Sequence, residues 1–68
     1  MIQTTMIDLK AALSSGNLEA KELIAFNCKQ ELFIQDRKSG KEIFSAYYGA
    51  NNACEDVCTL LNIEMQVV

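Results

Sequence analysis

The chain has 68 residues, of which half are hydrophobic, and its nine acidic and six basic residues give a net charge of −3. This length predicts one domain, residues 1–68, with a small core, and the apolar fraction argues against disorder. Scattered basic residues in an acidic chain disfavour direct binding of a nucleic-acid backbone. No apolar run approaches the ~20 residues that span a bilayer, so no membrane association is expected.

A short helix is predicted near the start of the chain. Thr5–Asp8 has the form of a capping box, with Thr5 as the N-cap residue. Met6, Leu9 and Leu13 follow at helical spacing. Gly16 is suited to a left-handed C-cap, so the helix is expected to end there.

The next segment, Leu18–Asn27, is ambiguous. Its first residues favour helix, whereas Leu23–Phe26 is a short apolar run that fits a strand equally well. We expect helix to about Ile24 and extended chain over Phe26–Cys28.

A β-hairpin is predicted over Gln30–Tyr48, closing at Lys38–Gly40 with Arg37 paired to Lys41. Gly40 would take the positive-φ position of a bulged turn.

This register gives the hairpin two different faces. It places Ile34 opposite Phe44 and Leu32 opposite Ala46, and shifting it by one residue would mix polar residues into the apolar face. The face expected to meet the core comprises Leu32, Ile34, Phe44, Ala46 and Tyr48. The opposite face comprises Glu31, Phe33, Gln35, Ile43, Ser45 and Tyr47.

A second helix and a final strand complete the predicted fold. Asn52, with Glu55 three residues later, predicts a helix start. An apolar stripe follows at Cys54, Val57, Cys58 and Leu61, widened by Ala53 and Leu60. Asn62 is a suitable stop, and Ile63–Val68 has the β-branched residues of a strand beside the hairpin. The expected fold is a small single α+β domain, in which the hairpin is extended to a three-stranded, mainly antiparallel sheet packed against two short helices.

The sequence offers little catalytic chemistry. It contains no histidine, the commonest general base, and no Gly-x-Ser-x-Gly motif. Its three glycines are isolated, so no phosphate-binding loop is present. We therefore predict a protein that is not an enzyme and that needs no cofactor or metal.

Three cysteines, Cys28, Cys54 and Cys58, leave an alternative open. They are too few for the disulfide framework of a secreted mini-protein, which favours a cytoplasmic location. Cys54 and Cys58 lie on the apolar stripe, where free cysteine packs as a small hydrophobe. Redox sensing or metal binding through the three thiols is the competing interpretation.

Phe33, Ile43 and Tyr47 are the candidate partner-binding residues, because the predicted fold assigns nothing to cover them. Their face lacks the basic residues that a nucleic-acid surface needs, so a protein–protein interface fits better. The expected function is a small acidic protein-binding module that inhibits or regulates a larger protein or complex. Self-association as a homodimer through this face is one alternative. Another is a phage or mobile-element inhibitor of host defence, such as an anti-CRISPR protein, that mimics nucleic acid.

Overall fold

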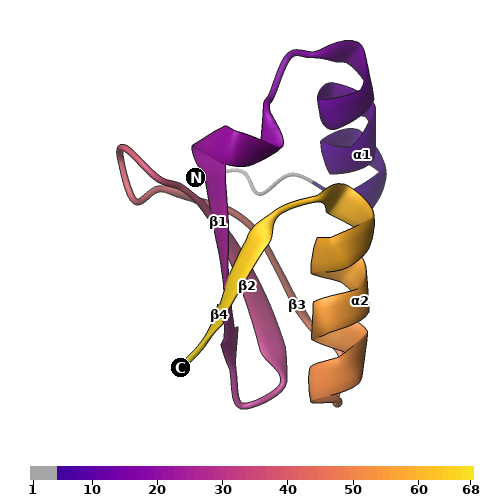
Figure 1. Ribbon diagram of the computed structural model, residues 1–68, viewed down its shortest axis with the longest axis vertical. Helices are drawn as coiled ribbons and strands as arrows, with labels where there is room; N and C mark the ends of the chain where they lie inside the picture. Colours follow the sequence, from indigo (N-terminus) through magenta and orange to yellow (C-terminus); the bar gives the residue numbers. More distant parts are fainter. Residues whose placement is uncertain (1–4) are drawn as a thin grey trace.

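The computed structural model describes residues 5–68 and confirms the α+β class (Figure 1). In chain order its elements are α1 (Met6–Ser15), the 3₁₀ turn η1 (Ala20–Glu22), β1 (Leu23–Cys28), β2 (Glu31–Asp36), β3 (Glu42–Tyr47), α2 (Asn51–Leu61) and β4 (Glu64–Val67). Within this described part of the chain, no helix has the length and apolar character needed to cross a membrane.

The four strands form one mixed sheet in the order β3-β2-β1-β4. β2 pairs antiparallel with both β1 and β3, whereas β4 pairs parallel with β1. The predicted terminal strand is therefore confirmed, but the sheet has four strands rather than three. The additional strand is β1, which comes from the segment that was ambiguous in sequence.

The prediction of helix to Ile24 is wrong. The chain makes only the short turn η1 before β1 begins at Leu23. β1 lies between β2 and β4, so strand partners on both sides satisfy its backbone and override the local helix propensity. A two-residue turn, Lys29–Gln30, connects β1 to β2 with φ values of 51° and 68°. Positive φ at both residues is the geometry of a type I′ hairpin turn.

The β2–β3 hairpin keeps the predicted register near its open end, with Leu32 opposite Ala46 and Ile34 opposite Phe44. Beyond that point the register shifts, and Gln35 pairs with Glu42 instead of Ile43. This irregularity is a β-bulge in which Ile43 is the extra residue.

The loop that closes the hairpin is longer than predicted. Lys41 pairs with Asp36 rather than with Arg37, because the Asp36 amide donates to the Lys41 carbonyl at 3.0 Å. Gly40 has the predicted positive φ, 72°, and its amide donates to the Asp36 carbonyl at 2.8 Å. The Asp36 carboxylate accepts from the amides of Lys38 and Ser39 at 2.8 and 3.2 Å. These bonds give the loop a defined shape.

Both ends of α1 agree with prediction, whereas only the C-terminal end of α2 does. The Asp8 amide donates to Thr5 Oγ1 at 3.1 Å, and Gly16 has a φ of 86°, so both predicted caps of α1 are confirmed. α2 ends as predicted at Asn62, which has a left-handed conformation. Its N-cap, however, is Ala50 rather than Asn52, and no side chain caps it.

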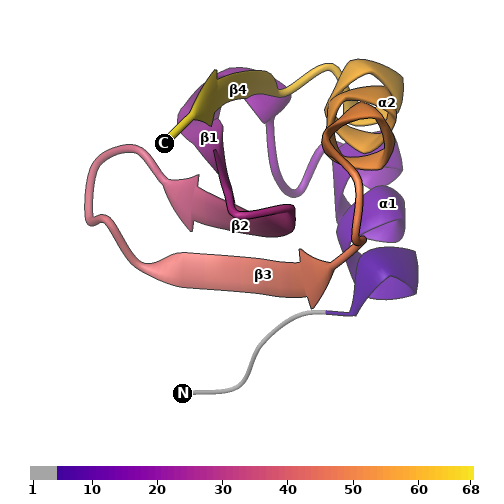
Figure 2. The same ribbon diagram turned by 90° about the horizontal axis from the view of Figure 1, so that it is seen from below.

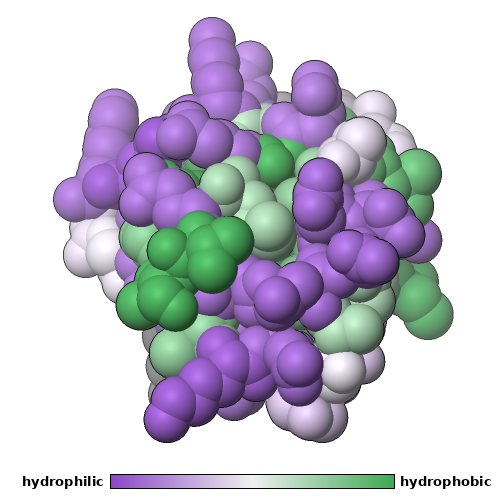
Figure 3. Space-filling model, turned by 60° about the horizontal axis from the view of Figure 1, so that its bottom comes forward, coloured by the Kyte–Doolittle hydropathy of each residue, from purple (hydrophilic) through white to green (hydrophobic). Residues whose placement is uncertain are grey.

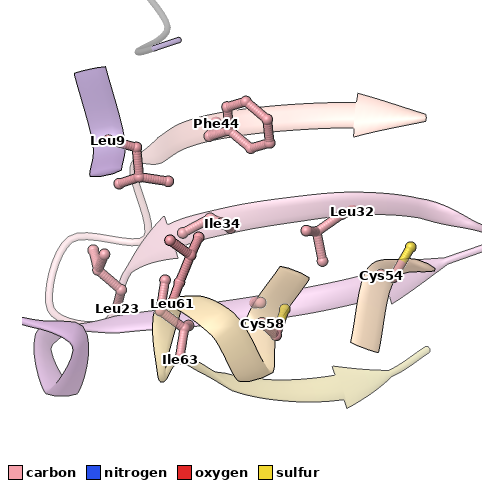
Figure 4. Close-up of a cluster of buried hydrophobic side chains, with 10 residues drawn as sticks. Leu9, Leu23, Leu32, Ile34, Phe44, Cys54, Cys58, Leu61 and Ile63 are labelled. Carbon is pink, nitrogen blue, oxygen red and sulfur yellow. The ribbon is translucent and has the colours of Figure 1, made fainter. Parts of the chain in front are cut away.

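Both helices pack against the same face of the sheet, and the core lies between the two layers (Figure 2). The buried apolar residues are Leu9, Leu23, Ala25, Leu32, Ile34, Phe44, Cys54, Cys58, Leu61 and Ile63 (Figure 4). The predicted core face of the hairpin is confirmed, because Ala46 and Tyr48 also pack against this cluster. Leu60 was expected to widen the stripe of α2, but it is 70% exposed.

Candidate binding surface

The sheet has a second face that points away from both helices (Figure 2). Side chains alternate between the faces of a strand, and the buried positions Leu23, Ala25 and Asn27 identify the core side of β1. The opposite side, which we call the outer face, carries Ile24, Phe26 and Cys28 from β1, Glu31, Phe33 and Gln35 from β2, Glu42, Ser45 and Tyr47 from β3, and Glu64 and Gln66 from β4.

The centre of the outer face is apolar. Phe26 and Phe33 are direct cross-strand partners on β1 and β2, the two central strands. Ile24 lies two residues before Phe26, and therefore on the same side of β1. All three are half-buried, and none belongs to the core cluster or to the residues packed against it. Neither helix lies on this side of the sheet (Figure 2).

Carboxylates lie around this centre. Glu31 begins β2, and Glu42 and Glu64 begin the two edge strands. Arg37, from the β2–β3 loop, reaches Glu64 with its Nη2 2.8 Å from Oε1. A hydrogen bond from this guanidinium lowers the pKa of Glu64, and the charge of Arg37 adds to the effect. Arg37 is further fixed by its Nε, which donates to the Lys21 carbonyl at 3.0 Å.

The structure separates the three residues predicted to bind a partner. Phe33 lies at the centre of the outer face, and Tyr47 lies on its edge strand, opposite Glu31 and 69% exposed. Ile43 instead packs against the core cluster. The bulge is the reason, since it turns the consecutive residues Ile43 and Phe44 toward the same side of the sheet.

Sequence reasoning missed Ile24 and Phe26. The segment Leu23–Phe26 is continuously apolar, so it shows no alternation that would assign its residues to two faces. Only the pairing of β1 with β2 reveals that Phe26 lies beside Phe33.

The three cysteines do not form one site. Cys54 and Cys58 are buried in the core, whereas Cys28 follows buried Asn27 and lies on the outer side of the sheet. Burial raises the pKa of the Cys54 thiol and raises that of Cys58 to about 11. Across residues 5–68, no group of three or more His, Cys, Asp or Glu side chains is placed to hold a metal ion. The arrangement does not supply the set of three thiols that the alternative interpretation requires.

Apolar side chains also reach the surface elsewhere. An open hollow of about 340 Å³ is lined by Lys10, Leu13, Ser14, Leu60 and Leu61, and so lies between α1 and α2. Val67, the last residue of edge strand β4, and Val68, which follows it, are largely exposed. Figure 3 shows separate hydrophobic groups, one at the left of the view and others at its right edge, with hydrophilic side chains between them. None of these places has the aromatic pair found at the centre of the outer face.

Comparison of the chain with protein-family models, with curated proteins and with solved structures gives no match.

Proposed function

We propose that this protein is a small non-catalytic module that docks on a larger protein through the outer face of its sheet. Binding there would inhibit or regulate the larger protein by occupying one of its surfaces. The observation that carries the proposal is the Phe26–Phe33 pair, which lies half-buried on the two central strands with no helix over it. Aromatic residues in the middle of a patch, surrounded by polar ones, are the usual energetic centre of a protein interface.

The size of the face indicates how the partner would engage it. Four strands about 4.8 Å apart, three of six residues and one of four, define an area of roughly 20 by 20 Å, or at most about 400 Å², at about 3.3 Å per residue. A standard interface buries about 800 Å² on each partner. We therefore expect the partner to extend beyond the sheet onto exposed Tyr47 and the β2–β3 loop.

Affinity capture with matched variants tests this proposal. The double substitution Phe26→Thr/Phe33→Thr removes the aromatic centre but keeps β-branched residues that favour strands. Captured proteins, quantified by mass spectrometry from a native lysate, should fall at least about tenfold with this variant, because losing one central aromatic anchor commonly costs 2 kcal/mol or more.

The control is Leu60→Gln, which removes an exposed apolar side chain from α2, on the helical layer. It should capture the same proteins as the unaltered chain. Circular dichroism and thermal melting establish that both variants are folded. Equal capture by all three folded proteins would contradict docking through the outer face.

A further inference from the structure

We infer that the partner's docking surface is basic: an apolar site surrounded by lysine or arginine side chains. This inference rests on the proposed function and adds the chemistry of the partner. It comes from the distribution of charge between the strands and the rest of the chain. The strands contain four acidic residues, Glu31, Asp36, Glu42 and Glu64, and no lysine or arginine.

Every basic residue lies outside the strands. They are Lys10 in α1, Lys21 in η1, Lys29 in the β1–β2 turn, and Arg37, Lys38 and Lys41 in the β2–β3 loop. Arg37 pairs with Glu64 and donates to the Lys21 carbonyl, so the charges of Arg37 and Glu64 offset each other, and Glu31 and Glu42 give the outer face its net negative charge. A partner that approaches the outer face along its normal therefore meets the aromatic centre and the carboxylates around it.

This charge distribution argues against a second copy of the chain as the occupant. Each outer face carries three glutamates and is reached by one arginine, Arg37, which pairs with Glu64, so two faces packed together would bring four excess negative charges into one interface. Like charges closer than the Debye length of about 8 Å repel with little screening at physiological salt. Juxtaposed like charges are also a common way in which interfaces reject a wrong partner. Phosphate-bearing surfaces, including nucleic acids and anionic lipids, are disfavoured for the same reason.

With a basic partner, the carboxylates of the outer face would instead pair favourably with lysine or arginine side chains. Charge pairs at the rim chiefly raise the association rate and select the partner, while the desolvated aromatic centre supplies most of the affinity. The outer face has both parts, with Phe26 and Phe33 in the middle and Glu31 and Glu42 toward two of its edges.

Selection of displayed random peptides on the immobilised protein tests the inference. Peptides retained by the unaltered chain should be enriched in lysine and arginine beside an aromatic or branched aliphatic residue. Selection on Glu31→Lys/Glu42→Lys should instead enrich acidic peptides. The matched control, Glu55→Lys/Asp56→Lys, changes the net charge equally on exposed positions of α2 and should select the same peptides as the unaltered protein.

A selected basic peptide then gives a quantitative readout. Glu31→Gln/Glu42→Gln should raise its Kd about 3- to 10-fold at low salt, and the difference should shrink as salt is added. Peptides that require Phe26 and Phe33 but show no excess of basic residues would overturn this inference and leave the proposed function standing. Failure to obtain any peptide that requires the two phenylalanines would overturn the proposed function itself.

Discussion

Asn27 is the one polar side chain buried in the core of the described chain, with 1% of its surface exposed. Its Nδ2 donates to Asn51 Oδ1 at 3.0 Å, which ties β1 to the first residue of α2. Its Oδ1 is buried without a hydrogen-bond donor. Turning the Asn27 amide alone would place its oxygen against the Asn51 oxygen, and turning both amides would restore the bond but leave the Asn27 nitrogen without an acceptor. An unsatisfied buried polar atom costs about 1–3 kcal/mol, more than the single hydrogen bond returns.

Replacing this residue should therefore increase stability. We expect Asn27→Val to raise the free energy of unfolding by about 1 kcal/mol, because it removes the unsatisfied atom and introduces a strand-favouring side chain. Asn27→Asp should lower it by several kcal/mol near neutral pH, because it buries a carboxylate beside the Asn51 oxygen. Urea unfolding of both variants measures the two changes. A clear loss of stability in Asn27→Val would show that the link to Asn51 outweighs the unsatisfied atom.

The buried cysteines give a prediction about reactivity and pH. The pKa of Cys58 is raised from 9.0 to about 11, first by burial and then by the nearby Cys54 thiol. As the pH rises, the Cys58 thiol therefore ionises in the unfolded chain before it ionises in the folded protein. The stability that the buried neutral thiol contributes is fully present below about pH 9 and is lost as the pH rises through about 11.

A thiol reagent at pH 8 should accordingly label Cys28 first, since it is only half-buried. Cys54 and Cys58 should react slowly, at a rate that increases with denaturant, because the thiolate is the reacting species. The Cys28→Ser variant is the control and should lose the fast phase. Three thiols that react equally fast in the native protein would contradict the burial of Cys54 and Cys58.

At the scale of elements, α2 begins without the stabilisation that α1 has. Thr5 caps α1 through its hydroxyl, whereas the N-cap of α2 is Ala50, and no acidic residue lies in its first turn. Ala50 already has the extended backbone conformation of an N-cap residue, with φ −156° and ψ 139°. Only the side-chain acceptor is absent.

We expect Ala50→Asp to raise the free energy of unfolding by about 1 kcal/mol, because its carboxylate would accept from amides of the first turn and complement the helix dipole. Ala50→Ser should give a smaller increase, since it lacks the charge. Thermal unfolding measures both, and Thr5→Ala, which removes the existing cap of α1, should lower stability by a similar amount. No gain from either Ala50 variant would mean that this helix end is satisfied in another way.

The elements also show what local sequence determines. α1, the β2–β3 hairpin and the stop at Asn62 were predictable, because capping residues, alternation and turn residues lie within a few positions of one another. The start of α2 was not, because Ala50 takes the N-cap position without a capping side chain and the predicted cap, Asn52, lies inside the helix. The displacement of Ile43 depends on a bulge, which one extra residue creates without any special residue type.

For the molecule as a whole, the decisive fact is that both helices lie on one side of the sheet (Figure 2). The sequence indicated that one hairpin face would lack cover, and it identified Phe33 and Tyr47 on that face. It did not reveal Phe26, because the position of β1 in the middle of the sheet depends on β2 on one side and distant β4 on the other. The candidate surface is thus a product of the tertiary arrangement, centred one strand away from where the hairpin alone would place it.

The parallel pairing of β4 with β1 also bears on how the sheet assembles. The two hairpins close over short connections, but Ile24 pairs with Glu64, a separation of 40 positions (64 − 24). Closing a longer loop costs more chain entropy, and contacts between distant residues slow folding. β4 is therefore expected to join the sheet after the two hairpins have formed. Until it joins, one edge of β1 remains open to hydrogen exchange and to pairing with foreign strands.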